Sequence, residues 1–338
     1  MTRDSLKTLF YPFEAEALSM PGQGTRALFL GAEPGFRLPE GFAATLTLVQ
    51  GFRPYVLSLQ ASGHKLVQRA EDEGFDLALV LAGRHRGLNE LRIAEAVERV
   101  SQGGLVIVAG GKEDGISSLR KRLGGMVEIE DHLPKYHGTA FWFRRDEKAD
   151  AAAVALRADN PEVLVEGRFH TAPGMFSFDR IDAGSRLLVE HLPQDIKGAV
   201  ADFCAGWGYV TAEIATRATS LKALDLFEAD FDALEAARRN VTGTDVAPGF
   251  YWCDLAKEPV ERRYDMVVMN PPFHQGRDAD PEIGQRMIRA ASAALKPGGR
   301  LFMVANRHLP YQPVLAATFS SVQEIAIDSA FRVWSAKR

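Results

Sequence analysis

The chain has 338 residues, of which 46% are hydrophobic and 25% charged, and a net charge of −4 at pH 7. This composition is typical of globular proteins and excludes collagen-like, disordered and disulfide-stapled classes. The length is enough for two domains with a core each, and the balanced charge excludes a general basic surface for nucleic acid.

The sequence indicates neither a membrane anchor nor a metal centre. No apolar run reaches the roughly 20 residues that cross a bilayer, and the stretch MTRDSLKTLFYPFEAEA is too acidic for a secretory signal. The two cysteines, Cys204 and Cys253, are too far apart for a CxxC pair or a zinc cluster. We therefore expect a cytoplasmic protein without membrane or metal partners.

Apolar runs alternate with helical patterns in both halves of the chain. Such alternation predicts a mostly parallel sheet covered by helices, and near-continuous apolar strands fit burial on both faces. In the second half the apolar runs are 199–205, 220–228, 264–270 and 299–306, and the helical stretches are 232–240 and 282–295. The Ala- and charge-rich stretch 146–159 predicts a helix or linker, so the expected domains are 1–148 and 149–338.

The two halves resemble each other. The segment 74–87 aligns with 263–276 at a constant offset, which places Asp76 on Asp265 and His85 on His274. Farther along, 96–111 aligns with 291–306, and both segments have a helical pattern, a Gly-Gly turn and an apolar strand. We therefore predict an α/β protein with two tandem Rossmann-like domains. The first copy lacks the polar Asn-Pro-Pro-Phe sequence of the second, which predicts that it is degenerate.

A glycine-containing loop, DFCAGWG, follows the apolar run at 199–203 and precedes a helical segment. Asp202, Ala205, Gly206 and Gly208 lie in this loop, where glycines let a ligand approach the backbone at the carboxyl edge of a sheet. Position 211 is Thr, so the third glycine of a dinucleotide-binding fingerprint is missing, and Asp202 would suit a cationic ligand. A tight turn without a ligand is the alternative interpretation.

Acidic residues stand at the ends of the next two apolar runs. Asp225 and Glu228 are both candidates to accept hydrogen bonds from a ribose, and the pattern of the following helix favours Glu228. Asp254 could meet the amine of an adenine, and a role as a helix N-cap is equally consistent with its position.

The sequence Asn270-Pro271-Pro272-Phe273 follows the run YDMVVM directly. Prolines fix φ and remove backbone donors, so the segment presents acceptors: the Asn270 side-chain oxygen and the Pro271 carbonyl. Two converging acceptors suit an NH₂ group and stabilise the positive charge that grows on its nitrogen during attack. Phe273 could stack on the base that carries the amine.

Taken in order, these motifs resemble class I S-adenosylmethionine (SAM)-dependent N-methyltransferases. The segments 168–193, 270–276, 295–311 and 331–338 are similar to the methyltransferase small domain of RsmC-type 16S rRNA guanine-N2 methyltransferases and of the related RlmG-type 23S rRNA enzymes. The resemblance implies a SAM cofactor, a degenerate first domain for RNA recognition or structural support, and ribosomal RNA or the small ribosomal subunit as partner. The catalytic residues that it implies are Asn270, Pro271, Pro272 and Phe273; the cofactor-binding residues are Asp202, Ala205, Gly206, Gly208, Glu228, Asp254 and Asn270, with Gly174 and Phe176 over the methionine end. The family loop usually has glycine where Ala205 stands, and Trp207 is bulky.

Contact with RNA would have to come from local basic patches. Candidates are Arg84 and Arg86, the run Arg120-Lys121-Arg122, the pair Arg144-Arg145, and His274, each of which could equally be a solvated or structural residue.

The resulting prediction is methylation of guanine N2 in 16S rRNA. Open alternatives are a 23S rRNA guanine, another amine in tRNA, DNA or protein glutamine, and an inactive RNA-binding assembly factor.

Overall fold

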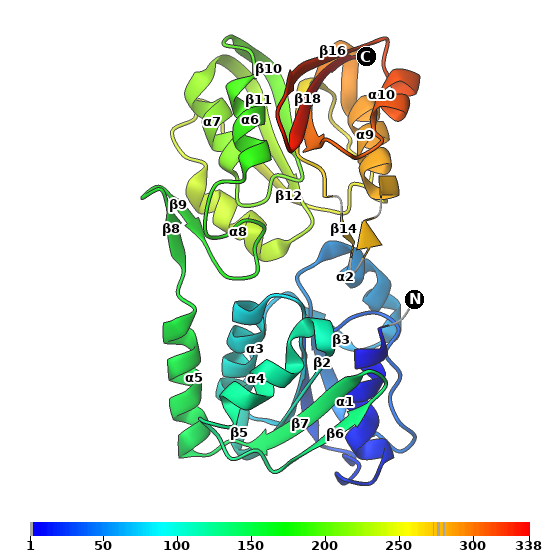
Figure 1. Ribbon diagram of the computed structural model, residues 1–338, viewed down its shortest axis with the longest axis vertical. Helices are drawn as coiled ribbons and strands as arrows, with labels where there is room; N and C mark the ends of the chain where they lie inside the picture. The colour runs from blue at the N-terminus through cyan, green and yellow to red at the C-terminus, as the bar shows by residue number, and fades with distance from the viewer. Residues whose placement is uncertain (1–2, 273, 276–277, 280) are drawn as a thin grey trace. The chain divides into compact units, whose positions relative to one another are not determined.

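The computed structural model describes residues 3–272, 274–275, 278–279 and 281–338, and the chain divides into two compact units after Glu162. The model is shown in Figure 1. In the described residues, no helix is both long and apolar enough to cross a membrane.

The first unit is a seven-stranded sheet with helices on both faces. Its strand order is β3-β2-β1-β4-β5-β7-β6, with β7 antiparallel to β5 and to β6 and the other pairs parallel. One face packs on α1 through Leu9 and Phe10, and the other on α3 and α5 through Ile93 and Leu156. The elements are α1 Asp4–Glu14, β1 Arg26–Leu30, β2 Thr45–Val49, α2 Arg53–Leu59, η1 Gln60–Ser62, β3 Lys65–Val67, β4 Phe75–Leu81, α3 Arg86–Arg99, β5 Val100–Gly111, η2 Lys112–Asp114, α4 Ile116–Leu123, β6 Asp131–Lys135, β7 Gly138–Arg144 and α5 Glu147–Asp159.

The second unit repeats this architecture with the order β12-β11-β10-β13-β16-β18-β17, in which β18 is antiparallel to both of its neighbours. Helices α6, α7 and α8 cover one face, and α9 and α10 cover the other (Figure 1). The elements are β8 Val163–Val165, β9 Phe169–Thr171, α6 Ala183–Glu190, β10 Ile196–Phe203, α7 Tyr209–Arg217, β11 Ala218–Glu228, α8 Phe231–Asn240, β12 Gly249–Trp252, β13 Tyr264–Met269, β14 His274–Gln275, β15 Asp278–Ala279, α9 Pro281–Ala294, β16 Leu295–Asn306, α10 Gln312–Thr318, β17 Ser321–Ile327 and β18 Phe331–Lys337.

The strand orders confirm the predicted pair of Rossmann-like domains. The sequence alignment placed 75–81 on 264–270 and 100–111 on 295–306. Strands β4 and β5 span 75–81 and 100–111, and their counterparts β13 and β16 span 264–269 and 295–306. The register extends the match, because Leu30 lies opposite Val49 and Val80, as Phe203 lies opposite Phe227 and Met269. Corresponding positions in the two units can therefore be compared residue by residue.

Helix α5 forms where the sequence predicted a helix or linker. The Asp146 side chain accepts a hydrogen bond from the Ala149 amide at 2.8 Å and caps the helix start. Leu156 is buried in the core of the first unit, and Arg157 pairs with Glu98 of α3 at 2.5 Å. These contacts place α5 in the first unit, so the division falls after Glu162 and not at the expected residue 148.

Candidate active site

The Asn270 side chain stands at the carboxyl end of β13 with its amide orientation determined by its neighbours. Its Nδ2 donates to Asp182 Oδ2 at 3.1 Å and to Ser185 Oγ at 2.9 Å. Asp182 is the N-cap of α6, where its carboxylate also accepts the Ser185 amide at 2.8 Å. A carboxylate can only accept hydrogen bonds, so the NH₂ of Asn270 must face it. The Asn270 carbonyl oxygen is thereby left as the acceptor for another molecule.

The prolines that follow Asn270 lie as the sequence predicted, at the end of a central parallel strand. Pro271 is buried and Pro272 exposed. The Pro271 carbonyl receives no hydrogen bond within the described part of the chain. Phe273 lies outside the described residues, and His274 is placed only as part of the two-residue strand β14.

The glycine-containing loop has left-handed backbone at three positions: Cys204 (φ 59°), Gly206 (φ 54°) and Gly208 (φ 88°). Position 205 is not among them, so alanine there causes no backbone strain. A Cβ atom at Gly206 would meet nothing within 4 Å, whereas one at Gly208 would lie 3.0 Å from Ala237. The loop therefore packs closely on α8 at Gly208 and is open to a ligand at Gly206.

Trp207, the bulky departure from the family pattern, is a structural residue of the site. Its ring is buried against Phe169 with the centroids 5.4 Å apart, and Nε1 donates to the Phe176 carbonyl at 2.8 Å. This bond holds the segment that begins at Gly174 beside the loop. The Phe176 side chain is 59% exposed, and a large apolar side chain at that exposure offers contact area to a ligand.

Glu228 braces the glycine-containing loop at the end of β11. Its carboxylate accepts the amides of Gly206 at 2.7 Å, Ala229 at 2.8 Å and Asp230 at 2.9 Å. Burial raises the pKa of this carboxyl, and the three amide bonds oppose the shift. Asp225, the other candidate, is engaged by Arg262 at 2.8 Å and by the Tyr264 hydroxyl at 2.7 Å. Glu228 is therefore the acid that remains at the carboxyl edge.

Asp254 follows β12 and has a structural partner. Its Oδ1 accepts the Ala256 amide at 3.0 Å, and its backbone carbonyl accepts the amides of Lys257 and Glu258. The Asp254 side chain is buried and does not line the cavity at Asn270. These contacts match the capping interpretation of the residue, and contact with adenine stays a prediction.

Asp202 is a buried carboxyl at the base of the loop. It is 2% exposed and accepts a hydrogen bond from Thr211 Oγ1 at 2.6 Å. Burial raises its pKa to about 7, with the nearby Glu228 carboxylate adding to the shift and the Thr211 bond opposing it. Thr211, which stands where a dinucleotide-binding fingerprint has its third glycine, thus holds Asp202 in place.

Some of these residues line one cavity, whereas Gly174, Gly208 and Glu228 are not among its lining residues. Phe176, Asp182, Asp202, Ala205, Gly206 and Asn270 all line it, together with Ser177, Ser185, Cys204, Trp207, Tyr209 and Val210. Two of the lining residues are acidic and none is basic, so the cavity suits a ligand that carries positive charge. In the described residues there is no group of three or more His, Cys, Asp or Glu side chains that could hold a metal.

The corresponding edge of the first unit is filled by its own side chains. Arg3 donates to the carbonyl of Ala82, the counterpart of Pro271, at 3.0 Å, and bridges Glu33 and Asp114 at 2.5 and 2.6 Å. At Gly31, the counterpart of Cys204, a Cβ atom would lie 2.6 Å from the Arg92 guanidinium.

Other groups at this edge are also engaged within the first unit. Gln50 stands where Glu228 stands in the second unit, and its Nε2 donates to the Ala32 carbonyl at 2.6 Å. Asn89 bonds both the amide and the carbonyl of Gly83, each at 2.7 Å. Polar groups that would meet a ligand are therefore satisfied internally.

Five of the seven basic residues predicted to contact RNA in the first unit carry acidic partners. Glu90 is shared by Arg86 at 2.8 Å and Arg122 at 3.0 Å, and Arg84 lies 3.9 Å from Glu113. Arg144 and Arg145 pair with Glu130 and Asp150. Arg120 and Lys121 lie in α4, beside Arg122. An RNA contact at these residues stays a prediction.

His85, the counterpart of His274, caps α3. Its Nδ1 accepts the Leu88 amide at 3.2 Å. A structural role was one of the alternatives that the sequence left open for His274, and its counterpart His85 has such a role.

The fold and this site define the class as class I methyltransferases. The sequence-family model of the methyltransferase small domain matches residues 166–335, which is half of the chain. Ribosomal RNA small subunit methyltransferase C of Shewanella loihica is 27% identical over 82% of this chain and 80% of its own length. Its namesake in Salmonella paratyphi A is 30% identical over 72% of this chain and 70% of its own length. The chain belongs to the methyltransferase small-domain family.

A solved structure supports the fold across both units. The T. thermophilus 16S rRNA N2 G1207 methyltransferase (RsmC), in complex with AdoMet and guanosine, superposes with a TM-score of 0.79 and 24% identity over 99% of this chain and 91% of its own. The predicted fold class is thereby confirmed.

Several residues that position the predicted site residues were not predicted from the sequence. Asp182 and Ser185 orient Asn270, Thr211 holds Asp202, and Trp207 anchors the segment at Phe176. The role of Asp182 as an N-cap could have been predicted, because an Asp directly before an apolar helical pattern is a typical N-cap. That this N-cap also reaches Asn270, 88 residues away, depends on the tertiary fold.

We predict that Asp202→Asn makes the ligand-free protein more stable at pH 8, and that this gain shrinks as the pH falls and disappears below the unfolded pKa near 4. Because the pKa of Asp202 is higher in the folded state than in the unfolded state, protonation of Asp202 stabilises the folded protein. This stabilisation is lost as the pH rises from the unfolded-state pKa near 4 through the folded-state pKa of about 7. The asparagine stays neutral throughout, so the gain approaches about 4 kcal/mol at most by the usual conversion of pKa shifts. Thermal melting across this pH range checks it.

Asp179→Asn, which changes an exposed carboxylate, is the matched control and should show no such pH dependence. An Asp202→Asn protein that is equally or less stable than the wild type at pH 8 would contradict the account of this buried acid.

Proposed function

We propose that the second unit transfers a methyl group from SAM to the exocyclic N2 amine of a guanine in 16S ribosomal RNA. The observation that carries the proposal is the pair of acceptors at the end of β13. The Asn270 oxygen is turned outward by Asp182 and Ser185, and the adjacent Pro271 carbonyl is free of partners within the described residues.

The residues present fit SAM. The open backbone at Gly206 and the acid Asp202 would hold the methionine end of SAM, with Phe176 covering it. Glu228, whose carboxylate already accepts the Gly206 amide, would accept a further hydrogen bond from a ribose hydroxyl. Bound there, SAM supplies a methyl group on a positively charged sulfur that is a good leaving group. An acidic cavity without basic lining residues suits that charge.

The chain's own contribution to the reaction is orientation and electrostatics. The lone pair of a guanine amine is delocalised into the ring, which makes the amine a poor nucleophile. Accepting both of its N–H bonds at Asn270 and Pro271 biases the nitrogen toward tetrahedral geometry. The same oxygens stabilise the positive charge that grows on the nitrogen, and fixed alignment with the methyl group lowers the barrier further. The proton then leaves to water, so no strong base is needed.

The choice of substrate rests on the relatives. The two bacterial relatives are named for the small ribosomal subunit, and the T. thermophilus enzyme acts on N2 of a 16S rRNA guanine. The partner is therefore ribosomal RNA or the small subunit, and the protein works in the cytoplasm. The first unit, whose corresponding edge is internally satisfied, binds no cofactor and supports RNA recognition or the fold of the second. Stacking of Phe273 on the base is part of the same proposal.

The direct test is to map N2-methylguanosine in ribosomal RNA from cells with and without this protein. Loss of one such nucleotide from 16S rRNA, restored by the wild-type gene, is the expected result. An unchanged 16S rRNA would contradict the proposal, and a loss from 23S rRNA would reassign the substrate.

We predict that Asn270→Ala lowers kcat by about 100- to 1000-fold, as the removal of one preorganised partner of a transition-state charge typically does. SAM affinity should stay within about twofold of wild type, because the proposed cofactor contacts lie in the loop 202–208 and at Glu228. Methyl transfer to 16S rRNA and calorimetric titration with SAM measure the two effects. Loss of SAM affinity in this variant would contradict the division of roles.

We predict that Asp182→Asn lowers kcat by about tenfold or more with little change in melting temperature. Asn is as good an N-cap as Asp, so α6 is preserved. An amide at position 182 can also donate, which lets the Asn270 amide flip and turns its NH₂ toward the substrate.

Asp146→Asn is the matched control, since Asp146 caps α5 through the same kind of bond, 2.8 Å long, far from Asn270 in the sequence. Equal kcat values for the two variants would show that Asp182 acts only as a cap.

A further inference from the structure

A hollow of about 460 Å³ lies at the carboxyl end of β16. It forms where β16 and β18 separate. Asn306 is the last residue of β16 paired with β18, and the Arg307 amide donates to the Ala330 carbonyl at 2.8 Å. The residues that line the hollow are Asn306, Arg307, His308, Ser329, Ala330 and Arg332.

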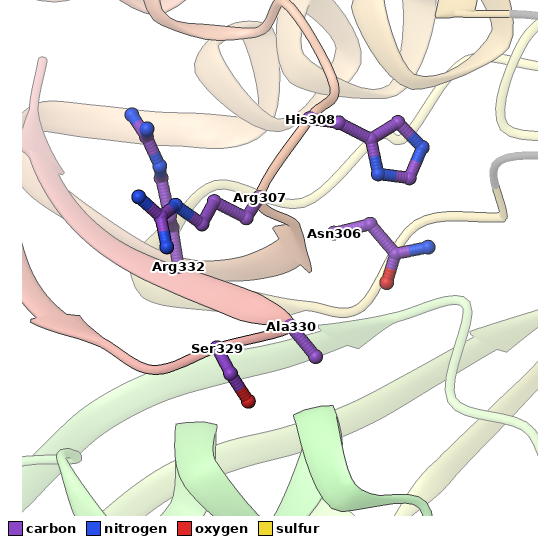
Figure 2. Close-up of a pocket in the computed structure, with 6 residues that line it drawn as sticks. All are labelled: Asn306, Arg307, His308, Ser329, Ala330 and Arg332. Atoms are coloured by element: carbon purple, nitrogen blue, oxygen red, sulfur yellow. The ribbon is translucent and has the colours of Figure 1, made fainter.

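The hollow collects positive charge without acidic lining residues. The side chains of Arg307 and Arg332 extend to the same side of it, and those of Asn306 and His308 to the other (Figure 2). Arg307 is exposed, and its guanidinium has no hydrogen-bond or ion-pair partner among the described residues. Two guanidinium groups at one hollow repel each other unless an anion lies between them.

Arg332 is only partly neutralised. One end of its guanidinium lies 3.5 Å from Glu324, and its Nε is buried without a hydrogen-bond partner. A buried donor without a partner carries a desolvation penalty that a bound acceptor removes. Phosphate oxygens match the planar fork of arginine donors, which can bind two of them at once.

The position of the hollow relates it to the candidate active site. Strand β16 lies beside β13 with Met303 opposite Met269, so Val304 faces the position of Asn270. Asn306 is two residues farther along, which puts the edge of the hollow roughly 8 Å from the backbone of Asn270 by ordinary strand spacing. A nucleotide whose base meets Asn270 therefore has its backbone near this hollow.

We propose that Arg307 and Arg332 bind a phosphodiester of the RNA strand that carries the target guanine, with His308 and Ser329 as further hydrogen-bonding groups. This inference rests on the proposed function, because it takes the base at Asn270 to belong to RNA. The unpaired Arg307 distinguishes this site from Arg86 and Arg122 of the first unit, whose guanidinium groups already contact Glu90.

The test is binding of a 16S rRNA transcript by wild-type, Arg307→Ala and Arg307→Lys proteins at several salt concentrations, without SAM. Arg307→Ala should weaken binding about tenfold, as the loss of one charge-assisted hydrogen-bonded contact does. It should also reduce the slope of log K against log salt by about one, the signature of a lost phosphate contact. Arg307→Lys should retain the slope because it keeps the charge.

Arg263→Ala is the matched control. Arg263 precedes β13 at the opposite edge of the same sheet, and its guanidinium contacts backbone carbonyls such as that of Val260 at 2.9 Å. This variant should bind RNA like the wild type. The two Arg307 variants should melt like the wild type, since the Arg307 side chain has no partner to lose among the described residues. Equal RNA affinity and salt slope in Arg307→Ala and Arg263→Ala would overturn the proposal.

The result of this RNA-binding test can be distinguished from the result of the test of the proposed function. Wild-type protein that methylates 16S rRNA, combined with no effect of Arg307→Ala on RNA binding, would overturn the phosphate site alone. An Arg307-dependent salt slope in a wild-type protein that methylates no ribosomal RNA would support the phosphate site and contradict the proposed activity.

Discussion

Polar groups at the carboxyl edge of a parallel sheet must find hydrogen-bond partners, and the two units of this protein meet that constraint in different ways. In the first unit the chain supplies the partners: Arg3 bonds Ala82, and Asn89 bonds Gly83. In the second unit the corresponding acceptors are left for another molecule, because Asp182 and Ser185 take only the donors of Asn270. The same strand order thus yields one edge whose polar groups are satisfied internally and one edge where Asn270 keeps an acceptor open.

The open edge of the second unit carries buried acidic groups, whose charged forms are disfavoured by burial. Asp202, Glu228 and Asp230 are grouped around the glycine-containing loop, and burial raises the pKa of each. A positively charged ligand would relieve this excess of carboxylates, which links ligand binding to stability. In the first unit, Gln50 replaces the acid at the position of Glu228, and Arg3 neutralises Glu33 and Asp114. At these positions the first unit therefore has neither the unneutralised acids nor the open acceptors of the second.

The sequence predicted what depends on local pattern and on strand topology. Asn270, Asp202 and Gly206 come together because each stands at or just after the carboxyl end of a strand and these ends lie at the same edge. The apolar runs located those strands. Asp182 and Ser185 could not be assigned in the same way, because their contact with Asn270 depends on how α6 packs against the sheet. The predicted RNA contacts show a further limit, since a basic run such as 120–122 does not indicate which arginines are already paired.

Charge pairing also changes how the overall composition is interpreted. A net charge of −4 excludes a general basic surface, yet it is compatible with a few arginines that lack acidic partners. In the second unit, Arg307 has no acidic partner among the described residues, and Arg332, which Glu324 neutralises only in part, lines the same hollow near Asn270. Recognition would then depend on a base pocket and a placed phosphate contact, with weak binding to RNA in general.

The central claim is that one fold is present twice and only the second copy keeps a cofactor site. Calorimetric titration of the whole chain with SAM tests it most directly. The account predicts one SAM per chain, with binding lost in Gly206→Trp, which fills the open face of the second loop, and retained in Glu33→Trp, the corresponding change in the first unit. Two SAM molecules per chain, or binding that survives Gly206→Trp, would contradict it.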